Sequence, residues 1–387
     1  MNDNRQARPR RPRDGNSTPP VPNAHLASLA TAVPPHELPQ DMVERAARRV
    51  LGPRYPAFER LAATFTTSGV ERRHSVVPLE WFERPQDWAS RNAAYLEGAG
   101  LLFEEVAALA LDRAGWHARD VDAVVTVSST GIATPTLEAR AAHTLGLRPD
   151  VQRVPLFGLG CAGGVTGLAH AAMMARARPG IRVLMVAVEA CTLSFRDDRM
   201  EKADIIATVL FGDGAAAACL STESGGPALG TGVEYMWPRT LDIMGWEVDP
   251  NGFGVIFDRS IPAFATEQFA GAAAHALRAS GIEATDLVRP VCHPGGMKVL
   301  DAIETALALP PGLLDVERDV LRDCGNMSAP TALFVLERFL ARGPLPPGPH
   351  MLAALGPGFT ASFLPLARTA DELRSLAPLP AQEPVGA

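Results

Sequence analysis

The sequence predicts an α/β fold whose sheet is covered by helices on both faces. Helical patterns and short apolar strands alternate along most of the 387 residues. Residues 122–129 (DAVVTVSS) and 181–190 (IRVLMVAVEA) are continuous apolar runs, as expected of strands buried on both faces. The alternation resumes after a break at the glycine-rich residues 224–232. This order of elements indicates packed α/β layers built from two similar halves.

Each half contributes several recognisable elements. The first has a helical pattern at residues 101–116, a helix that begins near Cys161 and a strand within residues 211–220. The second has helices at residues 266–281 and 331–343, a strand at 287–292 and two strands flanking Pro357. We expect an N-terminal half at residues 24–225 and a C-terminal half at residues 226–375. Residues 1–23, rich in arginine and proline, and residues 376–387 are expected to be loose tails.

Composition argues against several classes of protein. The net charge is −7, whereas a nucleic-acid-binding surface would be basic. No apolar run reaches the ~18 residues of a membrane span, and the first residues lack the apolar core of a secretory signal. The five cysteines include no CxxC pair, which argues against a disulfide framework and a structural zinc site. We therefore expect a reducing, cytoplasmic setting.

Cys161 is the candidate nucleophile. It lies between glycines in GLGCAGG (158–164), where an apolar run gives way to a helix. A helix N-terminus stabilises a thiolate, and Gly158 and Gly160 permit a tight bend before it. Gly163 and Gly164 would let another group approach closely. Most free cysteines are small buried apolar residues, and that role is expected for Cys191, Cys219 and Cys324.

Two further segments offer partners for this thiol. His293 ends the apolar run LVRPVC and precedes PGG, at the carboxyl end of a buried strand where ligands bind in α/β sheets. Asn326 lies in DCGNMSAPT, between a glycine turn and a helix. A structural histidine and a helix-capping asparagine are the plain alternatives. The functional interpretation is a base for the thiol and an amide donor for a developing oxyanion.

Taken together, these segments resemble the type III polyketide synthases, the chalcone synthase superfamily of the thiolase fold. GLGCAGG, VCHPGG and GNMSAPT resemble the family's cysteine, histidine and asparagine loops, and LFGDGAAA and LGPGFT resemble two further family segments. The matching segments cover most of the chain, from about residue 50 to about residue 366. The resemblance implies a homodimer with a thiolase-like five-layered α-β-α-β-α architecture, duplicated halves and a buried site at the end of a coenzyme A tunnel.

The resemblance also implies roles for individual residues. Cys161 would carry the starter acyl group as a thioester. Before loading, His293 would hold the Cys161 side chain as a thiolate in an ion pair. His293 and Asn326 would donate to the thioester oxygen of malonyl-CoA as it loses carbon dioxide, since prepositioned donors stabilise the enolate. Phe211 matches a gatekeeper phenylalanine that would exclude water. The chemistry needs no metal or redox cofactor.

Some positions differ from the plant members of the family. Thr134 stands where plant enzymes have a methionine that reaches across the dimer. Val255 stands near the position of the second gatekeeper phenylalanine of the plant enzymes. Leu355 lies in the LGPG loop. Only Arg60 matches a basic position that meets coenzyme A in plants. The stretch 240–262 is more similar to bacterial alkylpyrone and alkylresorcinol synthases. Smaller residues at these positions would leave room for a medium- or long-chain fatty acyl starter, from acyl-CoA or from an acyl carrier protein. Short-chain and aromatic starters are the alternatives.

The sequence does not determine which ring the product contains. Closure to a pyrone is favoured slightly over closure to a resorcinol. The residues expected around the reaction cavity carry hydroxyl groups that could serve either closure, although the same groups often satisfy nearby backbone: Ser128, Ser129, Thr130, Ser194 and Ser328. The main alternative is a single-condensation ketosynthase similar to 3-oxoacyl-ACP synthase III, whose histidine loop usually has the sequence HQAN. A non-catalytic thiolase-fold partner and a cysteine hydrolase are further alternatives.

Overall fold

The computed structural model describes residues 22–55, 58–199 and 201–374. The tails expected at residues 1–23 and 376–387 lie almost wholly outside the described residues. No helix within the described residues is long and apolar enough to cross a lipid bilayer.

One mixed sheet runs through the molecule, in the strand order β12-β13-β14-β8-β1-β7-β6-β4-β5 with β9 paired to β14. The first half supplies β1 (Ala24–Ala32), β4 (Ala123–Val127), β5 (Gln152–Leu156), β6 (Val183–Ala190) and β7 (Asp213–Ser221). The second half supplies β8 (Ala228–Leu229), β9 (Val233–Met236), β12 (Arg289–Cys292), β13 (His350–Gly356) and β14 (Thr360–Ala367). The short β8 pairs with both β1 and β14, and so joins the two halves of the sheet.

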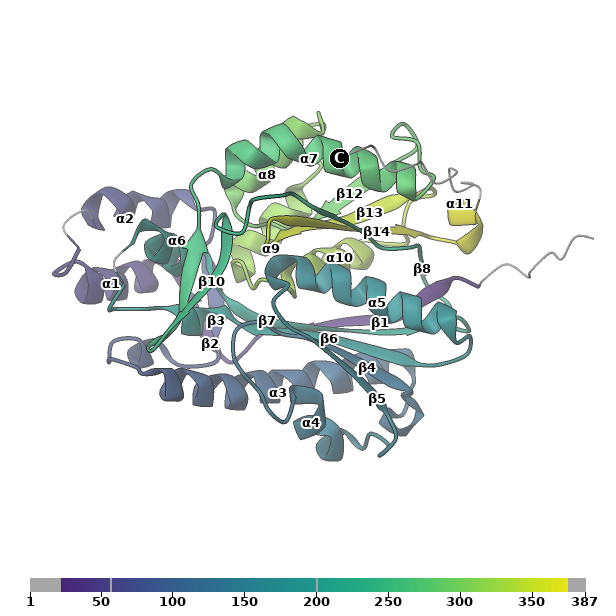
Figure 1. Cartoon of the computed structure of the whole chain (residues 1–387), viewed down its shortest axis with the longest axis horizontal. Helices are drawn as coiled ribbons and strands as arrows, with labels where there is room; N and C mark the ends of the chain where they lie inside the picture. Colours follow the sequence, from purple (N-terminus) through teal and green to yellow (C-terminus); the bar gives the residue numbers. More distant parts are fainter. Residues whose placement is uncertain (1–21, 56–57, 200, 375–387) are drawn as a thin grey trace, which may run out of the picture.

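Helices cover the two halves of the sheet in layers (Figure 1). The outer helices are α3 (Trp88–Ala114) and α4 (Leu137–Leu145) on the first half, and α7 (Ile261–Ala279) and α8 (Met297–Ala306) on the second. The helices α5 (Gly163–Ala177) and α10 (Thr331–Ala341) lie between the halves, and α9 (Asp315–Cys324) packs beside α10. Separate apolar clusters fill the central layer and the two outer ones. This confirms the expected five-layered α-β-α-β-α fold.

Most predicted elements occur where the sequence placed them, but α3 is longer than its apolar pattern. The helix begins at Trp88, well before residue 101, because the Asp87 side chain accepts a hydrogen bond from the Ser90 N–H at 2.7 Å and caps it. The first turns bury Arg91, Tyr95 and Ala99 at a spacing of four, a helical stripe that the apolar pattern alone does not mark because one of its members is charged. Gly115, with φ of 66°, ends the helix in the left-handed conformation.

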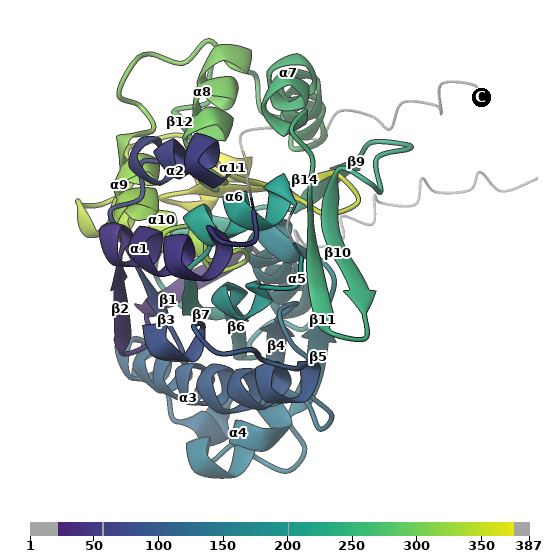
Figure 2. The ribbon, with the colours of Figure 1, turned by 90° about the vertical axis from the view of Figure 1, so that its left-hand side faces the viewer.

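Most of the remaining longer elements lie at one end of the layers (Figure 1). A hairpin of β10 (Met244–Asp249) and β11 (Gly252–Phe257) stands apart from the main sheet (Figure 2). α6 (Lys202–Leu210) contacts β11 and also packs against α1 (Gln40–Leu51) and α2 (Phe58–Thr67). The strand β2 (His36–Pro39) pairs with β3 (Arg72–Ser75). The short helices are η1 (Leu79–Trp81), η2 (Ala118–Asp120), η3 (Gly160–Ala162), η4 (Cys191–Ser194) and α11 (Ala370–Arg374).

Candidate active site

Cys161 lies on a sharp turn where η3 runs into α5, as the glycine pattern predicts. Gly160 has φ of +47°, and a Cβ there would lie 2.7 Å from the Pro357 ring. A Cβ on Gly164 would lie 2.1 Å from the carbonyl oxygen of Ala329. These glycines therefore let two loops of the second half pack directly against the nucleophile turn.

Cys161, His293 and Asn326 line one cavity, although they come from three distant segments. His293 follows β12, and Asn326 follows α9. The Cys161 Sγ lies 3.8 Å from Oδ1 of Asn326. The rest of this cavity is largely apolar; its walls include Met244, Phe257, Ile261, Phe269, Val299, Ile303 and Leu355. The predicted trio is thus brought together at a site with little polar surface.

Hydrogen bonds fix the orientation of the Asn326 amide. The Ser328 N–H donates to Oδ1 at 2.8 Å, so the amide oxygen faces Ser328 and Cys161. The Nδ2 group donates to the carbonyl of Gly295, in the histidine loop, at 3.3 Å. Ser328 has φ of 59°, an uncommon value for a residue with a side chain. The asparagine therefore presents its N–H donors on the side of His293.

Burial acts strongly on the two ionisable groups of the trio. It raises the pKa of the Cys161 thiol to about 11; hydrogen bonds with Ser328 and Asn326 oppose this rise, and the charge of Glu189 adds to it. Burial also lowers the pKa of His293 to about 3. Neither ring nitrogen of His293 has a hydrogen-bond partner within the described residues. Burial alone thus favours the neutral forms, and the thiolate–imidazolium pair stays a prediction.

Phe211 separates the surroundings of Cys161 from a second, apolar cavity. Its half-buried ring packs edge-on against Trp246, with centroids 6.3 Å apart. Cys161, Cys191, Phe211, Trp246 and Val255 all line the space on one side of this ring. Cys191 and Phe211 also line the second cavity. Phe211 therefore lies between the two cavities, and its role as a gate stays a prediction.

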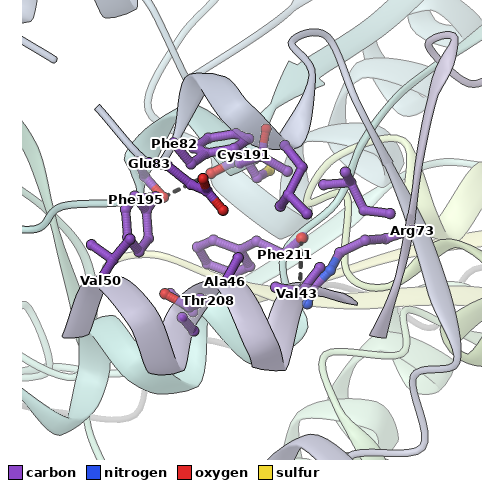
Figure 3. Close-up of a pocket in the computed structure, with 16 residues that line it drawn as sticks. Val43, Ala46, Val50, Arg73, Phe82, Glu83, Cys191, Phe195, Thr208 and Phe211 are labelled. Atoms are coloured by element: carbon purple, nitrogen blue, oxygen red, sulfur yellow. Dashed lines mark hydrogen bonds between the residues drawn. The ribbon is translucent and has the colours of Figure 1, made fainter. Parts of the chain in front are cut away.

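The second cavity, here called the apolar lobe, lies between α1, α6, η1 and η4 (Figure 3). Its wall is mostly aliphatic and aromatic and includes Val43, Ala46, Val50, Leu79, Phe82, Cys191, Phe195, Ala207 and Phe211. Arg73 approaches from one side and donates to the Phe211 carbonyl at 3.2 Å. The predicted cavity residue Ser194 lines this lobe and donates to the Cys191 carbonyl at 2.7 Å.

Ser128, Ser129 and Thr130 gather around a carboxylate that the sequence analysis did not single out. The Ser129 N–H lies 2.9 and 3.0 Å from the two oxygens of Glu189, and Thr130 Oγ1 donates to Oε2 at 2.7 Å. Ser128 Oγ is 3.4 Å from the same oxygen, and the Tyr95 hydroxyl is 2.8 Å from Ser128 Oγ. Burial raises the pKa of Glu189 to about 7. The sequence feature that could have identified Glu189 is its position as the one charged residue in the apolar run that forms the fully buried strand β6.

The other predicted residues divide between the cavities and the surface. Val255 and Ser328 line the space beside Phe211, and Leu355 lines the cavity with His293. Thr134 is exposed in the single chain, and Arg60 is exposed on α2, in none of the described cavities that reach Cys161. Trp246 was missed because nothing in its sequence neighbourhood places the hairpin against the nucleophile. Its indole N–H donates to the Ser129 carbonyl at 2.9 Å.

A thiolase-type fold in which cysteine, histidine and asparagine meet in an apolar cavity defines a class of acyltransferases that act through acyl-cysteine intermediates. The models of the N-terminal and C-terminal domains of chalcone and stilbene synthases match residues 21–224 and 229–345. The chain therefore belongs to the chalcone and stilbene synthase family and is a type III polyketide synthase, an acyltransferase. This class condenses coenzyme A thioesters with malonyl-CoA.

Curated relatives and a solved structure agree with this assignment. A 1,3,6,8-tetrahydroxynaphthalene synthase from Streptomyces peucetius subsp. caesius is 37% identical, over 88% of this chain and 92% of the relative. A putative chalcone synthase from Bacillus subtilis is 32% identical, over 88% of this chain and 98% of the relative. The crystal structure of 1,3,6,8-tetrahydroxynaphthalene synthase from Streptomyces coelicolor A3(2) superposes with a TM-score of 0.84 at 30% identity, covering 89% of this chain and 100% of that one.

Proposed function

We propose that the enzyme loads an acyl starter on Cys161 and extends it by decarboxylative condensation with malonyl-CoA. The Cys161 thiolate attacks the starter thioester, and coenzyme A leaves. Malonyl-CoA then loses carbon dioxide while His293 and Asn326 donate to its thioester oxygen, and the resulting enolate attacks the acyl group on Cys161. The observation that carries this proposal is the Asn326 amide, whose N–H group faces the histidine loop across the cavity that Cys161 lines.

The starter we propose is a medium- or long-chain fatty acyl group. The apolar lobe supports this choice because it shares Cys191 and Phe211 with the space around Cys161. Its aliphatic and aromatic wall would bury an alkyl chain at a gain of about 0.8 kcal/mol per methylene. The starter arrives as a coenzyme A thioester, with an acyl carrier protein as the alternative donor. Arg60, exposed on α2, is our candidate for a contact with coenzyme A.

A second candidate uses malonyl units alone. Two tetrahydroxynaphthalene synthases, from Streptomyces peucetius and Streptomyces coelicolor, are 37% and 31% identical to this chain. Trp246 supports the same candidate, because its large ring lines the space that Cys161 and Phe211 also line and leaves less room for a long starter there. The two candidates differ in whether a product forms without an added acyl-CoA.

For the fatty acyl product we propose closure to an alkylpyrone, with an alkylresorcinol as the alternative. Pyrone closure needs only attack of an enol oxygen on the thioester. The hydroxyls of Ser128 and Thr130 are already engaged with Glu189, which leaves Ser328 as the hydroxyl beside Cys161. Few hydroxyl groups near Cys161 are therefore left to assist an aldol closure, and this supports the pyrone.

We also propose that the enzyme is a homodimer. β5 is the last strand of the sheet among the described residues, and its outer edge is open. Phe157, the residue after β5, and Ile132, in the loop after β4, are large apolar side chains that are 56% and 45% exposed in the single chain. Thr134, at the position expected to cross the dimer, is exposed in the same loop as Ile132. Sedimentation equilibrium should give twice the chain mass, and Phe157→Asp should shift the protein toward the monomer.

Product analysis tests the catalytic proposal. The purified enzyme is incubated with labelled malonyl-CoA, alone and with acyl-CoAs of graded length, beside a Cys161→Ala control. Labelled alkylpyrones from long starters, absent from the control, would support the fatty acyl starter. A naphthalene product from malonyl-CoA alone would support the second candidate. A single β-ketoacyl product would exclude repeated extension, and a second series with acyl carrier protein thioesters tests the alternative donor.

A further inference from the structure

The strand that leads to His293 lies at an open edge of the sheet. β12 pairs with β13, and no other described strand pairs with it. The His293 N–H points inward and donates to the Ala353 carbonyl at 2.8 Å. The Cys292 N–H therefore points to the open edge, although Cys292 is fully buried. A buried N–H at such an edge requires an acceptor from outside the sheet.

Glu317 supplies that acceptor. Its Oε1 accepts the Cys292 N–H at 3.1 Å, and its Oε2 accepts from Nη2 of Arg289 at 2.6 Å. Glu317 is fully buried and Arg289 is 8% exposed, with its guanidinium 4.6 Å from the centre of the Phe339 ring. A buried ion pair is often no more stabilising than an apolar pair of similar size. The stability of the fold therefore accounts for an acceptor at the Cys292 N–H, but not for its supply by a charged residue of α9.

The position of Glu317 in the chain suggests the reason. Glu317 lies on α9, and the end of α9 leads through Gly325 directly to Asn326. Its hydrogen-bond partner Cys292 is the residue immediately before His293. One carboxylate thus joins the helix that carries the amide donor to the strand that carries the histidine. The Nδ2 of Asn326 makes a second link, to the Gly295 carbonyl beyond His293.

We propose that Glu317 is a positioning residue that sets the spacing between His293 and Asn326, with Arg289 as its counter-ion. This inference rests on the proposed roles of His293 and Asn326. The ring nitrogens of His293 have no hydrogen-bond partner within the described residues, so the position of its backbone at the end of β12 matters for where the ring lies. Loss of the Glu317 acceptor would free the end of β12. A displacement of about 1 Å at a catalytic group can lower a rate by roughly a hundredfold.

Two double variants separate the hydrogen bond from the charge. Arg289→Met/Glu317→Gln removes both charges and keeps an amide oxygen for the Cys292 N–H. Arg289→Met/Glu317→Leu removes both charges and the acceptor. Glu337→Gln is the control, because Glu337, on the neighbouring helix α10, also pairs with an arginine, Arg113 of α3. The readouts are kcat and KM for release of carbon dioxide from malonyl-CoA, the melting temperature and the alkylation rate of Cys161.

We expect the leucine variant to lose roughly tenfold to a hundredfold in kcat with KM nearly unchanged, and the alkylation of Cys161, which relies on His293, to slow as well. The glutamine variant and the control should keep kcat within about threefold of wild type. Should the leucine variant not fold, Glu317→Asp, whose carboxylate is one methylene short of the Cys292 N–H, should show the same selective loss.

Two results would overturn the proposal. One is a folded leucine or aspartate variant with the kcat of wild type. The other is a loss in the glutamine variant as large as that in the leucine variant, which would assign the effect to the charge pair. His293→Gln identifies a failure of the underlying function: if it releases carbon dioxide as fast as wild type, the proposed role of His293 fails and the positioning role fails with it. An impaired His293→Gln beside an unimpaired leucine variant would reject the positioning role alone.

Discussion

Phe211 and Asn326 are joined through their backbones. The Gly212 N–H donates to the Asn326 carbonyl at 3.0 Å, and the Asn326 N–H donates to the Leu210 carbonyl at 2.8 Å. The ring of Phe211 stands between the apolar lobe and Cys161, while the amide of Asn326 lines the cavity that Cys161 and His293 also line. Because two backbone hydrogen bonds link these two segments, a shift of the Phe211 segment would also shift the amide of Asn326.

Gly212→Ala should disturb both residues at once. A Cβ at Gly212 would lie 2.4 Å from the Cys324 carbonyl oxygen, so the two segments would have to separate. We expect a loss of about 1–3 kcal/mol in unfolding free energy and a clear drop in kcat for malonyl-CoA decarboxylation. Urea unfolding and carbon dioxide release measure the two effects. Gly271→Ala, on the exposed side of α7 with open space around it, should leave kcat unchanged and stabilise the protein slightly.

The reactivity of Cys161 should depend on His293. Burial raises the pKa of this thiol to about 11, and hydrogen bonds with Ser328 and Asn326 only partly oppose it. A thiol that reacts at pH 7 therefore needs a cation, which a protonated His293 would supply against the effect of its own burial. We expect iodoacetamide to alkylate wild-type Cys161 at pH 7. In His293→Ala the rate should be at least about a hundredfold lower and should rise steadily up to pH 10.

Mass spectrometry of the labelled peptide gives the alkylation rate of Cys161 itself, with Cys161→Ala as the blank. Equal rates in wild type and His293→Ala at pH 7 would contradict an ion pair between the two residues.

The chemistry-bearing loops were predictable because each combines a polar residue with glycine or proline beside a buried element. Cys161, His293 and Asn326 all carry this pattern, and the structure brings them into one cavity. Glu189 was not identified, because the hydroxyl residues around it were assigned to the cavity instead. The position of Trp246 depends on how a separate hairpin packs, and no local pattern encodes that contact. The role of Glu317 depends on an open sheet edge, which only the strand order reveals.

Filling the apolar lobe should change the preferred starter. Ala46 is a buried alanine of α1 that lines the lobe, and Ala46→Phe would place a ring in the path of an alkyl chain. We expect kcat/KM for long-chain acyl-CoA to fall at least about tenfold relative to short-chain acyl-CoA, since each excluded methylene forfeits about 0.8 kcal/mol. Decarboxylation of malonyl-CoA should stay near the wild-type rate. Arg45→Phe, on the exposed face of the same helix, is the control.

An unchanged starter profile in Ala46→Phe, with the protein folded, would show that the alkyl chain takes another route.

The stability of the enzyme should fall with rising pH partly because of Glu189. Burial raises the pKa of its carboxyl from 4.5 to about 7. Between these values the folded protein keeps a proton that the unfolded chain has released, so the unfolding free energy decreases as the pH rises. Glu189→Gln removes this contribution. We expect the difference in unfolding free energy between wild type and variant to change by about 2.5 kcal/mol between pH 5 and pH 8, in favour of the variant at the higher pH. The same dependence of the two proteins on pH would show that Glu189 does not titrate in this range.

The comparison with wild type is needed because burial also raises the pKa values of Asp213 and Glu317, which contribute to both proteins. Urea unfolding at the two pH values measures the difference, and Glu105→Gln, on the exposed face of α3, should follow the wild-type dependence.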